Sequence, residues 1–284
     1  MNDIALTTPL VSPEHLRAAL AAGATPLIVD CSFDLADPGA GERAFGEGHL
    51  PGAVYAHLDR DLAGARTGRN GRHPLPAPAD WAATLARLGV TPGRAVVVYD
   101  AQGGMYAARA WWMLRWVGHA AVSVLDGGLP AWKAIGGVVE TGPATPVAAP
   151  APYPAAPSLV ATLDADTLQK SLGRVTVLDA RAGERYRGEV EPLDARAGHI
   201  PGARSRFFKD NLDAQGRFRP AAELRAAFEA FGAAPGQVVH QCGSGVTACH
   251  NLLAMEVAGL AGSSLYPGSW SEWSADPARP VAVG

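Results

Sequence analysis

A cysteine at the start of a glycine-rich turn is the feature of this sequence best suited to chemistry. A short apolar run, predicted to be a buried strand, ends just before Cys242, and the turn after it leads into a predicted helix. Such a turn points backbone N–H groups inward, and the helix adds the positive end of its dipole. The pKa of a cysteine so placed can fall from about 8.5 to roughly 3.5–7.5. The pattern indicates a thiolate nucleophile.

The residues after Cys242 limit what that thiolate could attack. The sixth of them is Ala248, whereas a cysteine phosphatase needs an arginine there to hold phosphate. The turn also lacks the Gly-x4-Gly-Lys-Ser/Thr spacing of a nucleotide-binding loop. Its glycines leave room for one large, soft atom, so we expect a persulfide held by backbone donors. The predicted cradle consists of Gly243, Ser244, Gly245, Val246 and Thr247.

Composition and charge limit the partners. A net charge of −3 gives no support for binding to nucleic acid or to an anionic membrane surface. The eight histidines lack metal-ligand spacing, so neither a metal nor an organic cofactor is expected. Three cysteines without a CxxC pair cannot form a disulfide framework. With neither a signal peptide nor a membrane-length apolar run visible, the expected location is a reducing cytoplasm.

Two halves of the sequence repeat each other, with offsets of 141 to 150 residues. The matched segments are Leu27–Cys31 with Val177–Arg181, Gly48–Ala53 with Gly198–Ala203, Thr91–Val98 with Ala234–Val239, and Gly127 and Trp132 with Gly268 and Trp273. A proline- and alanine-rich stretch separates the copies. We therefore predict an N-terminal domain over 1–141, a linker over 142–158 and a C-terminal domain over 159–284.

Each copy alternates short β-branched runs with helical stretches, which is typical of an α/β fold with a parallel sheet and helices on both faces. The predicted strands are Leu27–Asp30, Ala95–Tyr99, Val122–Leu125, Thr176–Leu178, Gln237–His240 and Ser264–Tyr266. Ser12 followed by Pro13 predicts a helix start. In such sheets ligands bind beyond the carboxyl ends of the strands, which is where Cys242 lies.

Several motifs together resemble the rhodanese superfamily. Cys242–Ala248 is similar to the active-site loop of its two-domain members, in the form typical of 3-mercaptopyruvate sulfurtransferases. The repeated Gly-His-Leu/Ile-Pro-Gly-Ala element and the closing Gly268–Trp273 segment are similar as well. The resemblance implies tandem rhodanese-like domains of which only the second is catalytic. In agreement, Asp100 occupies the position of the cysteine in the first copy.

The resemblance implies a sulfurtransferase with a small anionic donor. Cys242 would take a sulfur from 3-mercaptopyruvate, and cyanide or a thiol such as thioredoxin would remove it, in two half-reactions. Thiosulfate is the alternative donor. Neutral residues after the cysteine favour mercaptopyruvate, whereas the absence of one expected arginine counts against it. A persulfide carrier that delivers sulfur to a protein partner is a further alternative.

The resemblance also implies roles for other side chains. Ser244 matches a serine with a catalytic part. Arg185 matches the arginine that binds the donor's carboxylate, and Arg181 a further rhodanese arginine. The family's usual second carboxylate arginine follows Pro-Glu-Pro directly, whereas Arg196 comes two or three positions late.

The weakest candidates lie in the first half of the chain. His49 matches a histidine assigned to a proton relay, with bracing of its own loop as the alternative, which the recurrence of the motif at His199 favours. Arg72 belongs to a basic stretch with Arg66, Arg69 and His73 that either leans over the site or is a solvated loop. The two remaining cysteines, Cys31 and Cys249, are expected to be buried core residues.

Overall fold

The computed structural model describes residues 6, 8–144, 151, 153–154 and 156–284, in two compact units. The first comprises Met1–Ala63, Pro76–Leu159 and Ala214–Arg217, and the second comprises Gly64–Leu75, Val160–Asp213 and Phe218–Gly284. The division along the chain therefore differs from the predicted one, because Gly64–Leu75 belongs to the second unit. The predicted linker over 142–158 lies partly outside the described residues.

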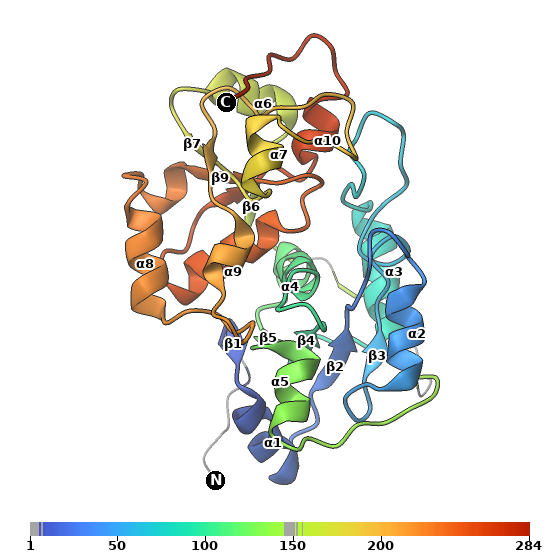
Figure 1. The fold of residues 1–284 in the computed structure, drawn as a ribbon. Coiled ribbons are helices and arrows are strands. Elements are labelled where there is room, and N and C mark those ends of the chain that lie inside the picture. Colours follow the sequence, from blue (N-terminus) through green and yellow to red (C-terminus); the bar gives the residue numbers. More distant parts are fainter. Residues whose placement is uncertain (1–5, 7, 145–150, 152, 155) are drawn as a thin grey trace. The chain divides into compact units, whose positions relative to one another are not determined.

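The first unit contains a parallel sheet with the strand order β1-β5-β4-β2-β3 (Figure 1). Its elements are β1 (Leu10–Val11), α1 (Pro13–Ala21), β2 (Leu27–Asp30), α2 (Ala40–Glu47), β3 (Val54–Tyr55), α3 (Pro78–Leu88), β4 (Val96–Tyr99), α4 (Ala107–Trp116), β5 (Val122–Leu125) and α5 (Gly128–Ala134). The predicted start of α1 is confirmed, since Ser12 caps it by accepting a hydrogen bond from the N–H of His15.

The second unit repeats this topology, with the strand order β6-β10-β9-β7-β8. Its elements are β6 (Ala161–Thr162), α6 (Ala165–Ser171), β7 (Thr176–Asp179), α7 (Gly183–Arg187), β8 (Arg204–Ser205), the 3-10 helix Phe208–Asn211, α8 (Ala221–Glu229), the 3-10 helix Pro235–Gln237, β9 (Val238–Gln241), α9 (Ala248–Val257), β10 (Ser264–Leu265) and α10 (Ser269–Trp273). The predicted α/β fold with two parallel sheets is confirmed.

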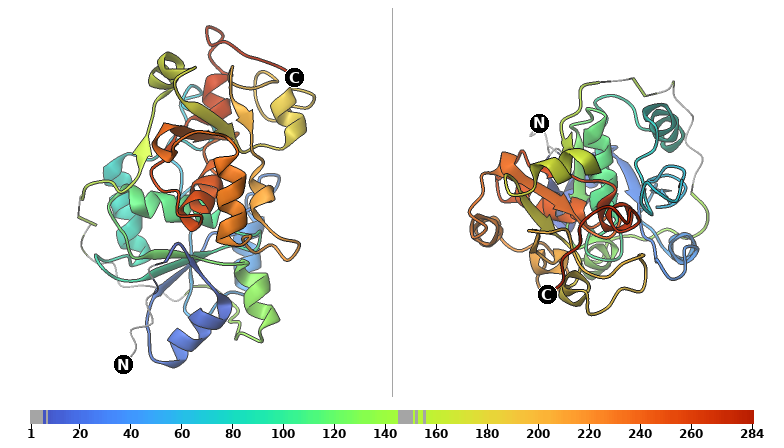
Figure 2. Two further views of the ribbon diagram at one scale, coloured as in Figure 1. Left: turned by 90° about the vertical axis from the view of Figure 1, so that its left-hand side faces the viewer. Right: turned by 90° about the horizontal axis from the view of Figure 1, so that it is seen from above.

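Helices cover both faces of each sheet, as the views in Figure 2 show. In the second unit, α6, α7 and α10 pack with Val177 and Val239 in one apolar cluster. On the opposite face, α8 and α9 contact β9 through His240, which lies beside Phe228 and Met255. Because β9 is central and buried along its whole length, the residue that follows it is held in place from both sides.

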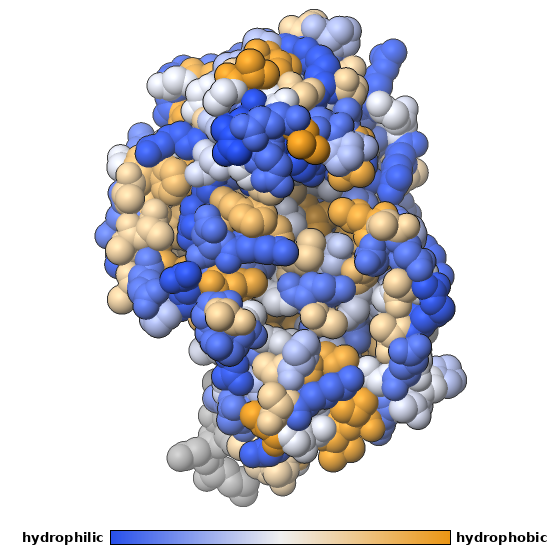
Figure 3. Space-filling view, in the orientation of Figure 1, coloured by the Kyte–Doolittle hydropathy of each residue, from blue (hydrophilic) through white to orange (hydrophobic). Residues whose placement is uncertain are grey.

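The surface shown in Figure 3 mixes hydrophilic side chains with small, separate apolar patches. In the described part of the chain, none of the helices combines the length and the apolar character that crossing a membrane requires.

Candidate active site

The second unit fixes the loop after β9 through its backbone. Cys242 N–H donates to Ser269 Oγ at 3.1 Å, and Trp270 N–H donates to the Cys242 carbonyl at 3.0 Å. Ser271 N–H donates to the carbonyl of Gly243 at 2.8 Å. The first turn of α10 therefore holds the first two residues of the loop, and this gives the Gly-Ser-Trp segment a structural reason to be there. Cys242 itself is 2% exposed.

Glycine at position 245 is required by its conformation. Gly245 has φ = +75°, and a Cβ atom there would lie 2.3 Å from the Pro267 carbonyl oxygen. Any side chain would therefore both clash with backbone and strain the loop. The tight turn that was expected from the sequence exists only because this residue has no side chain.

The loop presents backbone donors to its interior. Within the described residues, no acceptor is found for the N–H groups of Gly243, Ser244, Val246 and Thr247. The ten-residue helix α9 begins directly afterwards, at Ala248. Donors without internal acceptors, next to a cysteine and a helix start, match the cradle that a persulfide anion requires.

Ser244 has a partner from a distant segment of the same unit. Its Oγ lies 2.7 Å from Nδ1 of His73, which is 2% exposed. His73 belongs to Gly64–Leu75, the segment that interrupts the first unit along the chain. A hydroxyl bonded to an imidazole two residues from the nucleophile can hold or deliver a proton.

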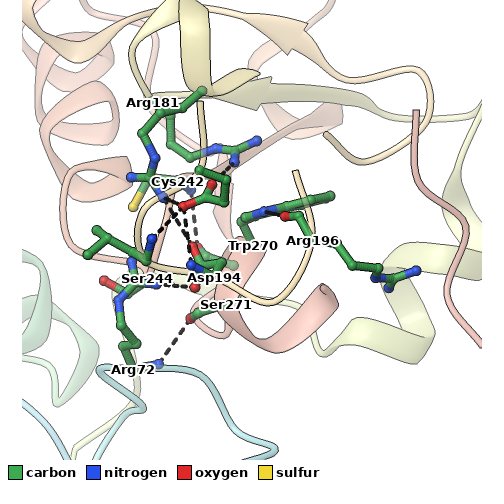
Figure 4. Close-up of polar contacts among 12 residues, drawn as sticks. Arg72, Arg181, Asp194, Arg196, Cys242, Ser244, Trp270 and Ser271 are labelled. Atoms are coloured by element: carbon green, nitrogen blue, oxygen red, sulfur yellow. Dashed lines mark hydrogen bonds and ion pairs between the residues drawn. The ribbon is translucent and has the colours of Figure 1, made fainter. Parts of the chain in front are cut away.

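Two arginines converge on the residue beside the nucleophile (Figure 4 shows Arg72, Cys242 and Ser244). A Cβ atom on Gly243 would lie 2.8 Å from Arg72 Nη2 and 3.4 Å from Arg185 Nη1. In the part of the chain that the structure describes, Arg72 and Arg185 make their side-chain hydrogen bonds through their other terminal nitrogens. The two nitrogens beside Gly243 are thus available to an anion.

Two buried carboxylates hold these arginines. Asp194 pairs with Arg72 and, at 3.1 Å, with Arg185, and its side chain is 3% exposed. Glu191 accepts from Arg185 at 2.6 Å and also from the backbone N–H of Asp194 at 3.2 Å. Burial raises the pKa of Asp194, which the positive charge of Arg72 opposes.

Arg181 does not take the substrate-binding place predicted for it. Its guanidinium is buried, pairs with Asp179 at 2.7 Å and Glu191 at 3.3 Å, and donates to the carbonyl of Gly198. It also stacks over Trp270, 4.7 Å from the ring. These contacts occupy its donors, so Arg181 ties the segment around Glu191 to the sheet instead of binding a donor.

Arg196 likewise has a structural role. It donates to the carbonyls of Trp273, Ser274, Asp276 and Arg279, and in Figure 4 its side chain points away from Cys242. These bonds satisfy backbone acceptors at the end of α10. The late position of Arg196 in the sequence is therefore explained, because this residue closes a helix end and does not bind a donor.

His49 braces its own loop. It stacks on Phe45 with ring centroids 3.9 Å apart, and its Nδ1 lies 2.7 Å from the Phe45 carbonyl oxygen. The repeated histidine, His199, stacks in the same manner on Tyr186. Two copies of one packing arrangement, only one of them in the unit with Cys242, favour bracing over the predicted relay.

The other two cysteines are buried, as expected, and are not joined in a disulfide. Burial raises the pKa of Cys31, and Cys249 Sγ donates to the Gly245 carbonyl at 3.3 Å. Among the described residues, no group of three or more His, Cys, Asp or Glu side chains is arranged to hold a metal ion.

Sequence reasoning gave too little weight to two residues of this site. His73 was seen only as part of a basic stretch, and Asp194 was not singled out. The available signal for His73 is its place beside Arg72 in a polar, glycine-containing stretch before Pro74. For Asp194 the signal was a carboxylate at the place where an arginine was expected.

Comparison with known proteins agrees with this geometry. The model of the rhodanese-like domain matches residues 12–135 and 164–276. A Pseudomonas aeruginosa protein named "Probable 3-mercaptopyruvate sulfurtransferase" is 49% identical, over 91% of this chain and 92% of its own length. A Mycobacterium tuberculosis protein, provisionally named thiosulfate sulfurtransferase SseB, is 42% identical over 97% of both chains.

A solved structure extends the likeness to three dimensions. The 3-mercaptopyruvate sulfurtransferase from Leishmania major superposes with a TM-score of 0.83 at 30% identity, covering 94% of this chain and 74% of that one. The two ranges matched by the rhodanese-like domain model fall one in each repeat, and they include every strand from β2 to β5 and from β7 to β10. The chain belongs to the rhodanese family.

Proposed function

We propose that this protein is a sulfurtransferase that carries sulfur from 3-mercaptopyruvate on Cys242. The observation that supports this most directly is the convergence of Arg72 and Arg185 on Gly243, beside open backbone donors. The relatives named for sulfur transfer from mercaptopyruvate add support. A reducing compartment such as the cytoplasm would keep Cys242 in its thiol form.

In the first half-reaction the Cys242 thiolate attacks the thiol sulfur of the donor. An S–S bond forms and the C–S bond breaks, and its electron pair leaves on carbon as the enolate of pyruvate. The enolate takes up a proton, which the hydrogen-bonded pair of Ser244 and His73 would supply. Arg72 and Arg185 would hold the donor's carboxylate throughout.

In the second half-reaction a thiol or cyanide attacks the outer sulfur of the persulfide. The S–S bond breaks, and its electron pair returns to Cys242 as thiolate. Between the two steps the open N–H groups of Gly243, Ser244, Val246 and Thr247 would stabilise the negative charge of the persulfide. Two separate half-reactions at one group predict ping-pong kinetics.

Thiosulfate is the second candidate donor, favoured by the name of the Mycobacterium tuberculosis relative. Attack on its outer sulfur would release sulfite and give the same persulfide. It carries two negative charges, whereas mercaptopyruvate carries one carboxylate. The two donors therefore differ chiefly in how much their binding depends on positive charge around Gly243.

The test is the steady-state kcat/KM for both donors with cyanide as acceptor, in the wild type and in Arg185→Ala. Loss of the carboxylate contact should raise KM for mercaptopyruvate by about tenfold to a hundredfold. Arg187→Ala is the matched control, because Arg187 is exposed and pairs with Glu189 on the surface. Equal KM values in both variants would refute the role of Arg185.

A further inference from the structure

Asp194 pairs with both arginines of the proposed donor site. It is nearly buried and contacts both arginines that reach Gly243. Its backbone N–H is fixed by Glu191, so the carboxylate is held in this place. A carboxylate bound to the two groups that should bind an anionic donor requires an explanation beyond packing.

The charges around this point balance. Three guanidinium groups are paired with three carboxylates, all in one connected network: Arg72, Arg181 and Arg185 with Asp179, Glu191 and Asp194. A donor therefore enters beside a network of six side chains whose formal charges sum to zero. It gains from the directed N–H groups near Gly243 but little from a general excess of positive charge.

From this balance we propose that Asp194 is a specificity-determining residue that limits the site to donors of low charge. The proposal rests on the function proposed above and concerns the same site. With Asp194 ionised, a monoanion places one negative charge in a neutral surrounding, whereas a dianion places two. The dianion has more to gain from any added positive charge, because Coulomb energy scales with the charge of the ligand.

Removing the charge of Asp194 should therefore change kcat/KM for the two donors by different factors. At about 6 Å and an effective dielectric constant of about 40, one unit of charge changes anion affinity by about tenfold per unit of ligand charge. Asp194→Asn should raise the ratio of kcat/KM for thiosulfate over mercaptopyruvate by about tenfold. A residue that merely positions Arg72 and Arg185 would lower both values together and leave the ratio unchanged.

Two control variants isolate charge from shape. Asp194→Glu keeps the charge and should keep the wild-type ratio. Glu189→Gln removes an exposed carboxylate from the same stretch of chain and should leave the ratio unaltered, since solvent screens that charge. Raising the salt concentration should shrink the effect of Asp194→Asn only modestly, because the group is nearly buried.

A binding experiment tests the proposal without turnover. In the Cys242→Ala background, calorimetry would measure the dissociation constants of sulfate, a dianion, and pyruvate, a monoanion, with and without Asp194→Asn. We expect the preference for sulfate over pyruvate to increase about tenfold. An unchanged preference, or no binding of either anion, would overturn the proposal.

The two proposals fail in different ways. Absence of any persulfide on wild-type Cys242 with either donor would refute the proposed function, while the binding preference would still decide the role of Asp194. Sulfur transfer in the wild type, together with an unchanged donor ratio in Asp194→Asn, would refute the role of Asp194 alone.

Discussion

The loops that follow the central strands of the two units differ in what accepts hydrogen bonds from their backbone N–H groups. In the first unit the carboxylate of Asp100 accepts four backbone hydrogen bonds of 2.8 to 2.9 Å, from the N–H groups of Gln102, Gly104, Tyr106 and Ala107. In the second unit the loop after Cys242 has open donors instead. The first loop contains acceptors of its own, whereas in the proposed function the second binds an anion in each turnover.

This difference separates the requirements of folding from those of chemistry. A turn of inward-pointing N–H groups is costly when nothing accepts from it, and Asp100 supplies the acceptors within its own unit. In the loop after Cys242 the N–H groups need an acceptor from outside the chain, which water, a donor molecule or a persulfide would provide. Of the residues described, none in the second unit is an internal acceptor equivalent to Asp100. Its loop N–H groups can therefore bind an anion that takes part in the reaction.

The largest expected effect comes from making the second loop like the first. Cys242→Asp should abolish sulfur transfer, with a loss of at least about 10³-fold, because a carboxylate cannot take up sulfur. Mass spectrometry after exposure to donor should find no added sulfur atom. Cys249→Ala is the control and should keep both activity and the added sulfur. Labile sulfur on the Cys242→Asp variant would contradict the assignment of the nucleophile.

The pair of Ser244 and His73 should come next. Ser244→Ala and His73→Ala should each lower kcat by about 10²-fold, since both remove one proton path. The double variant should lose no more than either single variant, because the two side chains act as a unit. Additive losses in the double-mutant cycle would show that the two side chains contribute separately.

Removing the Asp100 carboxylate from the first loop should lower stability but leave sulfur transfer unchanged. Asp100→Ala leaves four N–H groups, three of them in buried hydrogen bonds, without their acceptor and should lower the free energy of unfolding by about 2–4 kcal/mol. Denaturant titration measures this, and Asp100→Asn should lose less because its Oδ1 still accepts. The rate of sulfur transfer per folded molecule should stay the same. A large loss of kcat at full folding would give the first loop a part in the reaction.

The smallest effect at neutral pH concerns the strands that carry the two loops. Where β4 has Val98, β9 has His240, which is fully buried, and desolvation lowers the pKa of this imidazole to about 3. The unfolded chain binds a proton below about pH 6.5, whereas the folded chain does so only near pH 3. Stability should therefore fall as the pH drops through this range, by up to about 1.4 kcal/mol per pH unit.

His240→Val, which copies β4, should flatten that dependence. Denaturant titrations at about pH 7.5 and about pH 5 would compare the variant with the wild type. Similar slopes with pH in both proteins would mean that another buried group controls acid stability.

Residue patterns predicted the repeat, the family and the strands that span four residues, because apolar runs of that length carry a clear signal. Among the strands of two residues they found β10 and missed β1, β3, β6 and β8, since so short a strand carries little periodic signal. The family assignment needed no geometry, because the loop after Cys242 and the repeated motifs are continuous in sequence.

The arginines show where sequence reasoning reached its limit. Arg181 and Arg185 stand four positions apart near the start of α7, yet one is fully paired inside the unit and the other reaches Gly243. The difference comes from Asp179, two positions before Arg181, and from Asp194, nine positions after Arg185. The sequence does not reveal which carboxylate pairs with which arginine. The same holds for Arg72, whose partners lie far along the chain.

Because Gly64–Leu75 belongs to the second unit, it constrains when the site can form during synthesis and where the chain can be cut into fragments. Arg72 hydrogen-bonds Ser271 across 199 positions of sequence, so the site cannot close during synthesis until nearly the whole polypeptide has emerged. A fragment cut at the junction of the repeats would retain the reactive thiol but lack a histidine and a cation from upstream. The two repeats therefore do not separate into two complete units at their junction, because Gly64–Leu75 of the first repeat belongs to the second unit.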